Sequence, residues 1–98
     1  MYARLTTIVF APTEPEIGET LFQQILPAVE ELEGFRGMLM LSGLEDRSLA
    51  VLTLWETAEA LAAAQPVLEG IKKAETSFRQ VEATDTVRFY VAGSRLNP

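Results

Sequence analysis

The sequence predicts a single α+β domain whose elements run in the order strand, helix, strand, strand, helix, strand. Three observations support this prediction. The chain has 98 residues, which is a usual length for one domain. Four runs are rich in β-branched and aromatic side chains, and two segments repeat apolar residues at helical spacing. Short polar stretches separate these segments without a linker, so we expect residues 1–98 to form one domain.

Residues 2–10 are predicted to form the first strand, because β-branched and aromatic side chains dominate this run and Pro12 ends it. The sequence T-E-P-E at 13–16 resembles a capping box, and its acidic side chains suit the positive end of a helix dipole. The first helix is expected to end at Gly34, with a kink or restart at Pro27. Its predicted apolar face consists of Ile17, Leu21, Phe22, Ile25, Val29 and Leu32.

The second half of the chain predicts a β-hairpin, a helix and a last strand. Residues 35–44 and 48–55 are the two hairpin strands, joined by a short polar turn. Thr57 is expected to cap the second helix, and Pro66 is expected to divide that helix in two. Residues 84–91 are predicted as the last strand. The resulting β-α-β-β-α-β order is the split βαβ, or ferredoxin-like, arrangement with a four-stranded antiparallel sheet.

The hairpin strands are apolar on both faces, although two helices can cover only one face of a four-stranded sheet. The uncovered face would carry either Met38 and Met40 or Leu39 and Leu41, with a similar pair from residues 49–55. Covering about four such side chains at ~1.5–3 kcal/mol each is worth roughly 6–12 kcal/mol per chain, as an upper bound. That value is comparable with the stability of a whole domain. We therefore predict a two-fold homodimer that forms through this sheet face.

The composition excludes several kinds of partner and site. The net charge is −6, and the sequence lacks a basic stripe of the kind that binds nucleic acid or anionic lipid. There are no cysteines and no histidines, which removes thiolate chemistry, the commonest metal ligand and the usual general base. Apolar runs are too short for a membrane span, and the N-terminus has the pattern of a strand. We expect a cytoplasmic protein without a metal or other cofactor.

Two short stretches resemble a known family. The sequence T-L-W-E-T-A-E-A-L at 53–61, together with G-F-R-G at 34–37, resembles the antibiotic-biosynthesis monooxygenase-like domains of the dimeric α/β-barrel superfamily. Element order extends the resemblance over almost the whole chain. The resemblance implies two ferredoxin-like protomers packed sheet to sheet as a barrel. It also implies a small pocket between the sheet and the helices of each protomer.

The resemblance implies one of several activities. Members of the superfamily include cofactor-free oxygenases of aromatic polyketides, quinol-forming enzymes and haem-degrading enzymes. The haem-degrading branch ligates iron through a histidine on the second helix and uses an asparagine on the first strand. This sequence has no histidine, and its only asparagine is Asn97 in the tail. Haem degradation by that route is therefore not expected.

The best single candidate for a ligand-binding residue is Trp55. It matches a tryptophan at the strand-to-helix junction that lines the pocket in several members of the resembled family. Its ring could form a wall for a planar aromatic ligand, with the indole N–H as a donor. The alternative is a large core residue at the end of a strand.

Polar residues inside the predicted strands are the other candidates. Three arginines lie within predicted strands: Arg4, Arg36 and Arg88. Burying an arginine side chain there costs free energy unless its charge is paired. One of the three could hold a phenolate or enolate oxygen. The alternative is an edge position, a salt bridge at the rim or a dimer contact. Thr7 and Thr53 are plausible hydrogen-bond donors if they face the helices. The predicted substrate-binding residues are Trp55, Thr53, Thr7, Arg4, Arg88 and Phe22.

Two hypotheses of function follow. The first is a cofactor-independent monooxygenase, or a related small enzyme, that acts on a hydroxylated aromatic or quinol-type substrate. The deprotonated substrate would pass an electron to oxygen, and the protein would supply a dry pocket, orientation and stabilisation of the anion. The alternative is a non-catalytic dimeric binding module for a small apolar ligand. No catalytic residue is assigned, because no nucleophile–base pair, pair of carboxylates or phosphate-binding loop can be assembled from the sequence.

Overall fold

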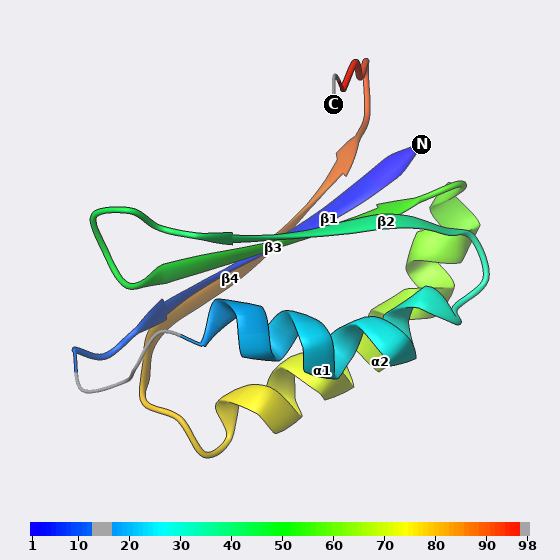
Figure 1. Cartoon of the computed structure of the whole chain (residues 1–98). Helices are drawn as coiled ribbons and strands as arrows, with labels where there is room; N and C mark the ends of the chain where they lie inside the picture. Colours follow the sequence, from blue (N-terminus) through cyan, green and yellow to red (C-terminus); the bar gives the residue numbers. More distant parts are fainter. Residues whose placement is uncertain (13–16, 97–98) are drawn as a thin grey trace.

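The computed structural model describes residues 1–12 and 17–96, and it confirms the predicted order of elements. The chain folds into two layers, with an antiparallel sheet on one side and two helices on the other (Figure 1). The strands are β1 (Tyr2–Phe10), β2 (Phe35–Ser42), β3 (Ser48–Trp55) and β4 (Val81–Tyr90), and the helices are α1 (Gly18–Glu30) and α2 (Ala58–Thr76).

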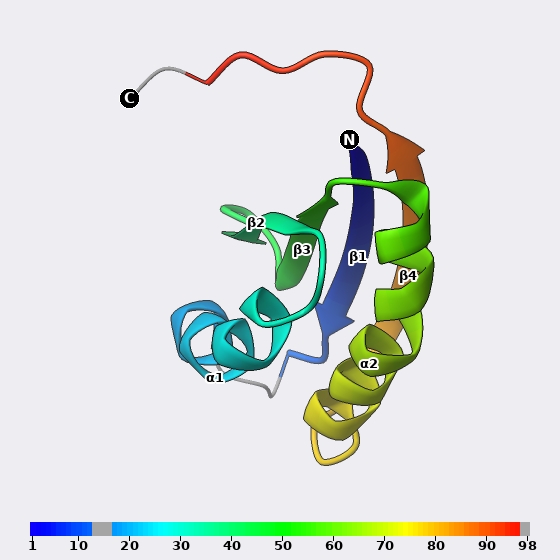
Figure 2. The same cartoon turned by 90° about the vertical axis from the view of Figure 1, so that its right-hand side faces the viewer.

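The strands lie in the order β2-β3-β1-β4, and each pairs antiparallel with its neighbours. β1 and β3 therefore occupy the middle of the sheet, while β2 and β4 form its edges. Figure 2 shows α1 beneath the side formed by β2 and β3, and α2 beneath the side formed by β1 and β4. The predicted ferredoxin-like α+β fold is confirmed.

Successive residues of each strand point alternately toward the helices and away from them. In β2, Met38 and Met40 contribute to the space under the helices, whereas Leu39 and Leu41 remain 48% and 52% exposed on the other side. This resolves the two alternatives that the sequence left for β2. We call the uncovered side of the sheet the open face. Its large apolar side chains are Leu5, Val9, Leu39, Leu41, Leu52, Leu54, Val87 and Phe89.

The first helix runs without interruption through Pro27, so the expected kink or restart does not divide it. The chain turns at Gly34, whose φ of 80° lies in the left-handed region that glycine adopts without strain. A Cβ at this position would also lie 2.4 Å from the Cβ of Ala60, so the close approach requires glycine. The helix itself ends at Glu30, four residues before the predicted stop, and Gly34 lies in the turn that leads into β2. The capping box predicted at 13–16 falls outside the described residues.

The expectation that Pro66 divides the second helix is wrong, because α2 is one helix with Pro66 inside it. Thr57 caps it as predicted, since its Oγ1 accepts a hydrogen bond from the Ala60 amide at 3.0 Å. Leu61 and Leu68 are buried on either side of the proline. A mid-helix proline costs about 3 kcal/mol. Burial of these two leucines at ~1.5–3 kcal/mol each offsets that cost.

The last strand begins earlier than the sequence predicted. β4 starts at Val81, which pairs with Phe10 beyond a register shift in β1. Glu82 and Ala83, between Val81 and Thr84, have low strand propensity, yet β1 provides a neighbouring strand for this segment to pair with. Pairing with a neighbouring strand therefore extends β4 by three residues beyond the predicted 84.

Two groups of buried side chains join the helices to the sheet. One contains Val29, Trp55, Leu61, Ala64 and Leu68. The other contains Ile8, Phe10, Leu21 and Leu49.

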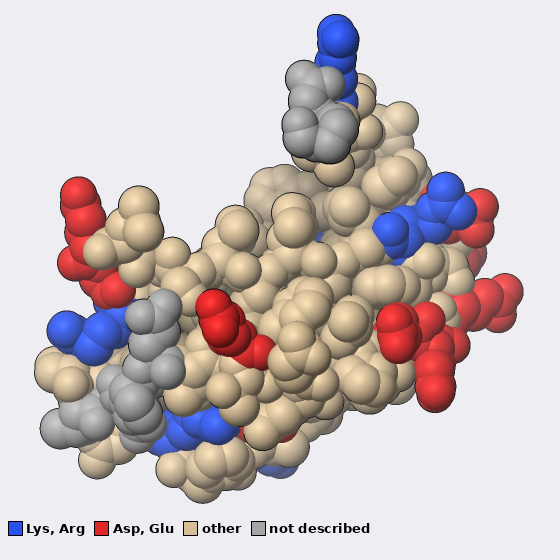
Figure 3. Space-filling view, viewed as in Figure 1, with Lys and Arg blue, Asp and Glu red and all other residues tan. Residues whose placement is uncertain are grey.

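Charged side chains lie around this core in separate places. On the side shown in Figure 3, acidic side chains gather where α1 leads into β2 and α2 begins, and the basic ones are scattered. No helix in the described part of the chain is long and apolar enough to cross a membrane.

Candidate functional site

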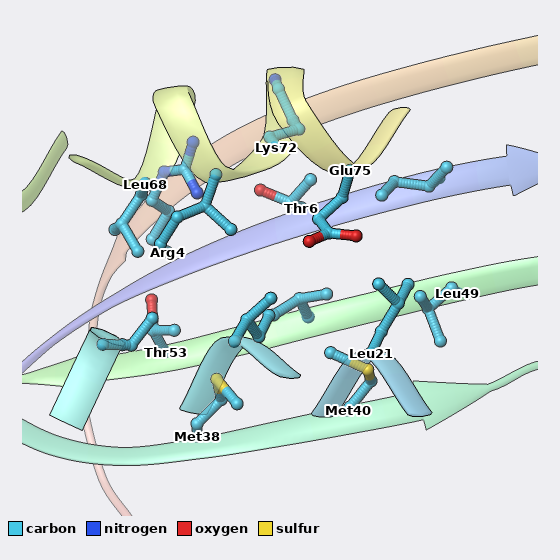
Figure 4. Close-up of a pocket in the computed structure, with 15 residues that line it drawn as sticks. Arg4, Thr6, Leu21, Met38, Met40, Leu49, Thr53, Leu68, Lys72 and Glu75 are labelled. Atoms are coloured by element: carbon cyan, nitrogen blue, oxygen red, sulfur yellow. The ribbon is translucent and has the colours of Figure 1, made fainter. Parts of the chain in front are cut away.

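A cavity of about 60 Å³ lies between the sheet and both helices (Figure 4). Three strands form its wall on the sheet side, and their register explains which residues do so. One row across the sheet places Met38, Thr53 and Arg4 side by side on β2, β3 and β1. The next row places Met40, Val51 and Thr6 side by side.

The two helices close the cavity from the other side, and they differ in chemistry. α1 contributes Leu21, Ile25 and Val29, which recur at helical spacing and are all apolar. α2 contributes a mixed stripe of Leu68, Ile71, Lys72 and Glu75. The cavity is therefore apolar along β2 and α1, polar where β1 faces α2, and mixed along β3, which contributes Thr53.

Arg4 is the most buried charged side chain of this polar wall, with 5% of the residue exposed. Its Nε donates to Gln65 Oε1 at 2.7 Å, and its Nη2 donates to Glu69 Oε1 at 2.5 Å. Both partners come from α2. A buried guanidinium is tolerated only when it is paired and hydrogen-bonded in this way. Helix α2 therefore fixes the position of the Arg4 guanidinium at the cavity wall.

Glu69 connects Arg4 to a second cation. Lys72 Nζ lies 3.2 Å from Glu69 Oε2 and 3.4 Å from Thr86 Oγ1. Desolvation is the largest single influence on the Glu69 carboxyl and raises its pKa, but the hydrogen bonds from Lys72 and Arg4 together outweigh it. The net effect is a pKa below the ordinary value of 4.5. Glu69 thus stays ionised and holds both cations in place.

Thr6 extends this polar network into the sheet. Its Oγ1 lies 3.0 Å from Thr86 Oγ1, so the two hydroxyls share a hydrogen bond between β1 and β4. Thr6 is buried and lines the cavity. A continuous set of polar contacts therefore runs from Gln65 through Arg4, Glu69 and Lys72 to Thr86 and Thr6.

Glu75 lies farther along α2 on the same side of the helix as Lys72. Its carboxylate extends from the helix into the cavity region in Figure 4. Arg79 Nη1 lies 3.1 Å from Glu75 Oε2 and also donates to the Glu75 backbone carbonyl. The Arg79 guanidinium in turn lies 4.2 Å from the centroid of the Phe78 ring. These contacts fix the direction of the Glu75 side chain.

Trp55 is completely buried beside the cavity, and it does not belong to the cavity wall. Its Nε1 donates to Thr53 Oγ1 at 3.0 Å. Its ring meets Phe35 edge to face, with centroids 5.8 Å apart. Trp55 therefore touches the site through Thr53, which does line it.

The structure brings two of the six sequence-predicted site residues to the cavity, Arg4 and Thr53. Thr7 points to the open face, because it alternates with Thr6 along β1. Arg88 is the register partner of Arg4, but it lies exposed on the edge strand β4 and lines a shallow groove with Tyr2. Ligand binding by each of these residues stays a prediction.

Phe22 lies half-buried on α1, in a separate depression beside Met38 and Leu39. Arg36 is exposed at the irregular start of β2, where the pairing shifts between Phe35 and Gly37. The structure brings neither side chain to the cavity wall.

Sequence reasoning missed the polar residues that α2 contributes. Lys72 and Glu75 continue the apolar stripe of Leu68 and Ile71 at spacings of three and four residues. That spacing was the signal that could have placed both side chains at the sheet. Within the described residues, no group of three or more acidic, histidine or cysteine side chains could hold a metal ion.

Comparisons with known proteins identify the fold through solved structures. No protein-family model matches the chain, and no curated protein matches it. A candidate antibiotic biosynthesis monooxygenase from Deinococcus radiodurans is 18% identical with a TM-score of 0.73, covering 100% of this chain and 98% of that one.

Two similar structures come from Streptomyces. A monooxygenase from the gene ActVA-Orf6 of Streptomyces coelicolor, in complex with nanaomycin D, is 15% identical with a TM-score of 0.74, covering 99% of this chain and 92% of that one. A variant of SnoaB, a cofactor-independent oxygenase from Streptomyces nogalater, is 17% identical with a TM-score of 0.72, covering 95% and 94%. This chain therefore has the ferredoxin-like fold of the antibiotic-biosynthesis monooxygenase-like domains.

Proposed function

We propose that this protein is a cofactor-independent monooxygenase that acts on a small hydroxylated aromatic or quinol-type substrate. The observation that carries the proposal is the apolar cavity with the paired Arg4 guanidinium in its wall. Support comes from structures of the same fold, which include a cofactor-independent oxygenase and a monooxygenase bound to nanaomycin D.

The reaction needs no external reductant. The substrate anion passes an electron to O₂, and the two radicals combine to form a peroxide at the substrate carbon. Loss of water then cleaves the O–O bond, so that a ring CH₂ and O₂ become a ring C=O and H₂O. One oxygen atom remains in the product and the other leaves as water, which balances the atoms and electrons.

The protein contributes position and charge. The apolar side chains from α1 and β2 hold a ring against the sheet and exclude water from it. Arg4 and Thr53 present donors to an oxygen atom on the ring, and Lys72 presents a second positive charge. A single preorganised donor to a developing oxyanion is worth about 2.7–4 kcal/mol of barrier reduction.

The size of the cavity limits what can enter without movement. A buried apolar cavity of about 150 Å³ holds a benzene molecule. The cavity here is about 60 Å³, so even one aromatic ring requires neighbouring side chains to move. Met38 and Met40 line it, and methionine is the most adaptable apolar side chain. We infer that substrate binding repacks these two methionines.

We also propose that the open face pairs with a second copy of the chain. Leu39, Leu52, Leu5 and Val87 form one row of register partners across all four strands. Leu39 and Val87 are 48% and 43% exposed in the single chain. A row of apolar side chains across a whole sheet is an aggregation hazard unless it is covered. Two-fold pairing would cover it with an identical surface.

The alternative function is a non-catalytic dimeric binding module for a small apolar ligand. The observation that favours it is the pairing of Arg4 with Gln65 and Glu69, which occupies two of the guanidinium donors. A binding module would be stabilised by its ligand without forming a product.

The test is aerobic incubation with a panel of hydroquinones and anthrone-type substrates, with oxygen uptake and product both measured. We expect turnover by the wild-type protein and a loss of at least about 100-fold in kcat/KM in Arg4→Met. Arg36→Met, at an exposed arginine away from the cavity, is the matched control and should retain full activity. Thermal stabilisation by these compounds without product would favour the binding module. If the compounds are not turned over and do not stabilise the protein either, both functions are overturned.

A further inference from the structure

We propose that Glu75 accepts the proton of the substrate hydroxyl and that Lys72 stabilises the oxyanion that remains. This inference rests on the proposed function and names a proton acceptor in a chain without histidine. In the step, the substrate O–H bond breaks and an O–H bond forms on the Glu75 carboxylate. The electron pair stays on the substrate oxygen, which becomes the anion that reacts with O₂.

The position of Glu75 is the first support. Among the described residues that line the cavity, the charged side chains are Arg4 from β1 and Lys72 and Glu75 from α2. The lining residues of α1, β2 and β3 are uncharged. Glu75 is thus the carboxylate that a ligand in this cavity would meet, and Figure 4 shows it extending toward the strands.

Chemistry removes the other groups as proton acceptors. An arginine guanidinium does not lose its proton in proteins and has no acceptor atom. Threonine hydroxyls at positions 6 and 53 are too weakly basic to take a proton from a phenol. Lys72 forms an ion pair with Glu69 at 3.2 Å, and an ammonium group has no acceptor atom for a proton. Glu69 itself is bound to Arg4 and Lys72 and does not line the cavity.

The contacts of Glu75 leave one of its oxygens for a ligand. Arg79 pairs with Oε2, and within the described chain no donor contacts Oε1. The Arg79 side chain is only 12% exposed and lies against the Phe78 ring, so its position is constrained. Arg79 therefore acts as a positioning residue that directs the second carboxylate oxygen into the cavity.

Lys72 and Glu75 form a cation and a proton acceptor on one side of α2. Residues three apart in a helix are neighbours on its surface. A simple phenol and a glutamate carboxyl ordinarily differ in pKa by about six units, which makes unaided proton transfer unfavourable. A positive charge next to the phenolate reduces that difference. The substrate must also be acidic, which points to a hydroxyl conjugated with a ring carbonyl rather than to a simple phenol.

The test is the pH dependence of kcat/KM for Glu75→Gln on any substrate that the wild-type protein oxidises. We expect a loss of about 10²–10⁴-fold at pH values below the pKa of the substrate hydroxyl. The loss should disappear above that pKa, because the substrate then arrives already ionised. Arg79→Lys should give a smaller loss with the same pH dependence.

The matched control is Glu59→Gln, an exposed glutamate in the first turn of the same helix. It should match the wild-type protein at every pH. An equal loss at all pH values in Glu75→Gln would indicate a structural role and overturn the proposal. Activity equal to that of Glu59→Gln would overturn it as well.

A binding measurement separates this inference from the proposed function. If the wild-type protein oxidises nothing, the oxygenase proposal fails, but the contact between Glu75 and a ligand hydroxyl can still be tested. The probe is 4-nitrophenol, whose absorbance reports its ionisation. We expect the bound probe to have an apparent pKa at least about one unit higher in the wild-type protein than in Glu75→Gln, because the carboxylate repels the phenolate. Equal pKa values, or no binding, would overturn the role of Glu75.

Discussion

The two faces of the sheet carry similar large apolar side chains, but these side chains lie in different surroundings. Beneath the helices, Met38 and Met40 border a cavity whose polar wall contains Arg4, which is ion-paired with Glu69. One residue away along the same strand, Leu39 and Leu41 lie half exposed with no helix over them. The difference is set by the alternation of side chains along a strand, which separates neighbouring residues into different environments. A single strand can therefore serve a ligand site and a subunit interface at once.

The largest expected change in the free energy of unfolding comes from a substitution in the core under the helices. Trp55→Ala removes a completely buried ring, and we expect it to lower the free energy of unfolding by about 3–5 kcal/mol. Leu41→Ala on the open face should cost well under half as much at low protein concentration, because Leu41 is already 52% exposed. Urea unfolding of both variants measures the difference. Equal costs would contradict the distinction between the faces.

The next largest effect concerns the open face itself. The double variant Leu39→Glu and Leu41→Glu places charges where we expect a second copy to pack. The dissociation constant of the dimer should rise by at least about 100-fold, which corresponds to roughly 2.7 kcal/mol. Leu44→Glu, at a fully exposed leucine in the hairpin turn, is the matched control and should leave association unchanged. Sedimentation over a range of concentrations gives both constants, and identical behaviour of the two variants would argue against the interface.

Two threonines, one on each face of the sheet, provide a smaller and closely matched comparison. Thr53→Val removes the acceptor of the buried Trp55 N–H while keeping the size of the side chain. An unsatisfied buried donor costs about 1–3 kcal/mol. Thr7→Val on the open face should change the free energy of unfolding by less than about 0.5 kcal/mol, because it breaks no buried contact of this kind. Thermal unfolding of the two variants would show whether the hydrogen bond matters.

The smallest effect is the dependence of stability on pH through Glu69. Its pKa is lower in the folded protein than its ordinary value of 4.5, so its contribution is fully present above that value. The contribution is lost as the pH falls through the lower, folded pKa. Because the Glu69 side chain is 50% exposed, we expect a contribution of a few tenths to about 1 kcal/mol. The stability difference between the wild-type protein and Glu69→Gln should therefore shrink below pH 4.5, and a difference that grows there would contradict the pairing.

The sequence was sufficient for the order of elements, because period-two and helical patterns report local burial directly. It was insufficient at Pro66, where buried leucines on both sides keep α2 in one piece. Local propensity contains no information about such tertiary contacts. The start of β4 was missed for the same reason, since pairing with Phe10 extends the strand to Val81.

The site was harder to predict than the fold. Arg4 and Arg88 look equivalent in sequence, and they are register partners, but Arg4 is buried on the central strand β1 while Arg88 is exposed on the edge strand β4. Thr6 and Thr7 differ by one position, and the sequence does not say which of two apolar faces the helices cover. Glu75 was missed because its direction depends on how α2 is rotated against the sheet.

The most direct test of this division is a methyl NMR titration that follows β2 from Met38 to Leu41. Adding a small hydroxylated aromatic should shift the methyl signals of Met38 and Met40 and leave those of Leu39 and Leu41 nearly unchanged. Diluting the protein should do the reverse, since the dimer would dissociate from the open face. If the ligand shifted the two leucines, or dilution shifted only the two methionines, the two faces would not have the separate roles proposed for them.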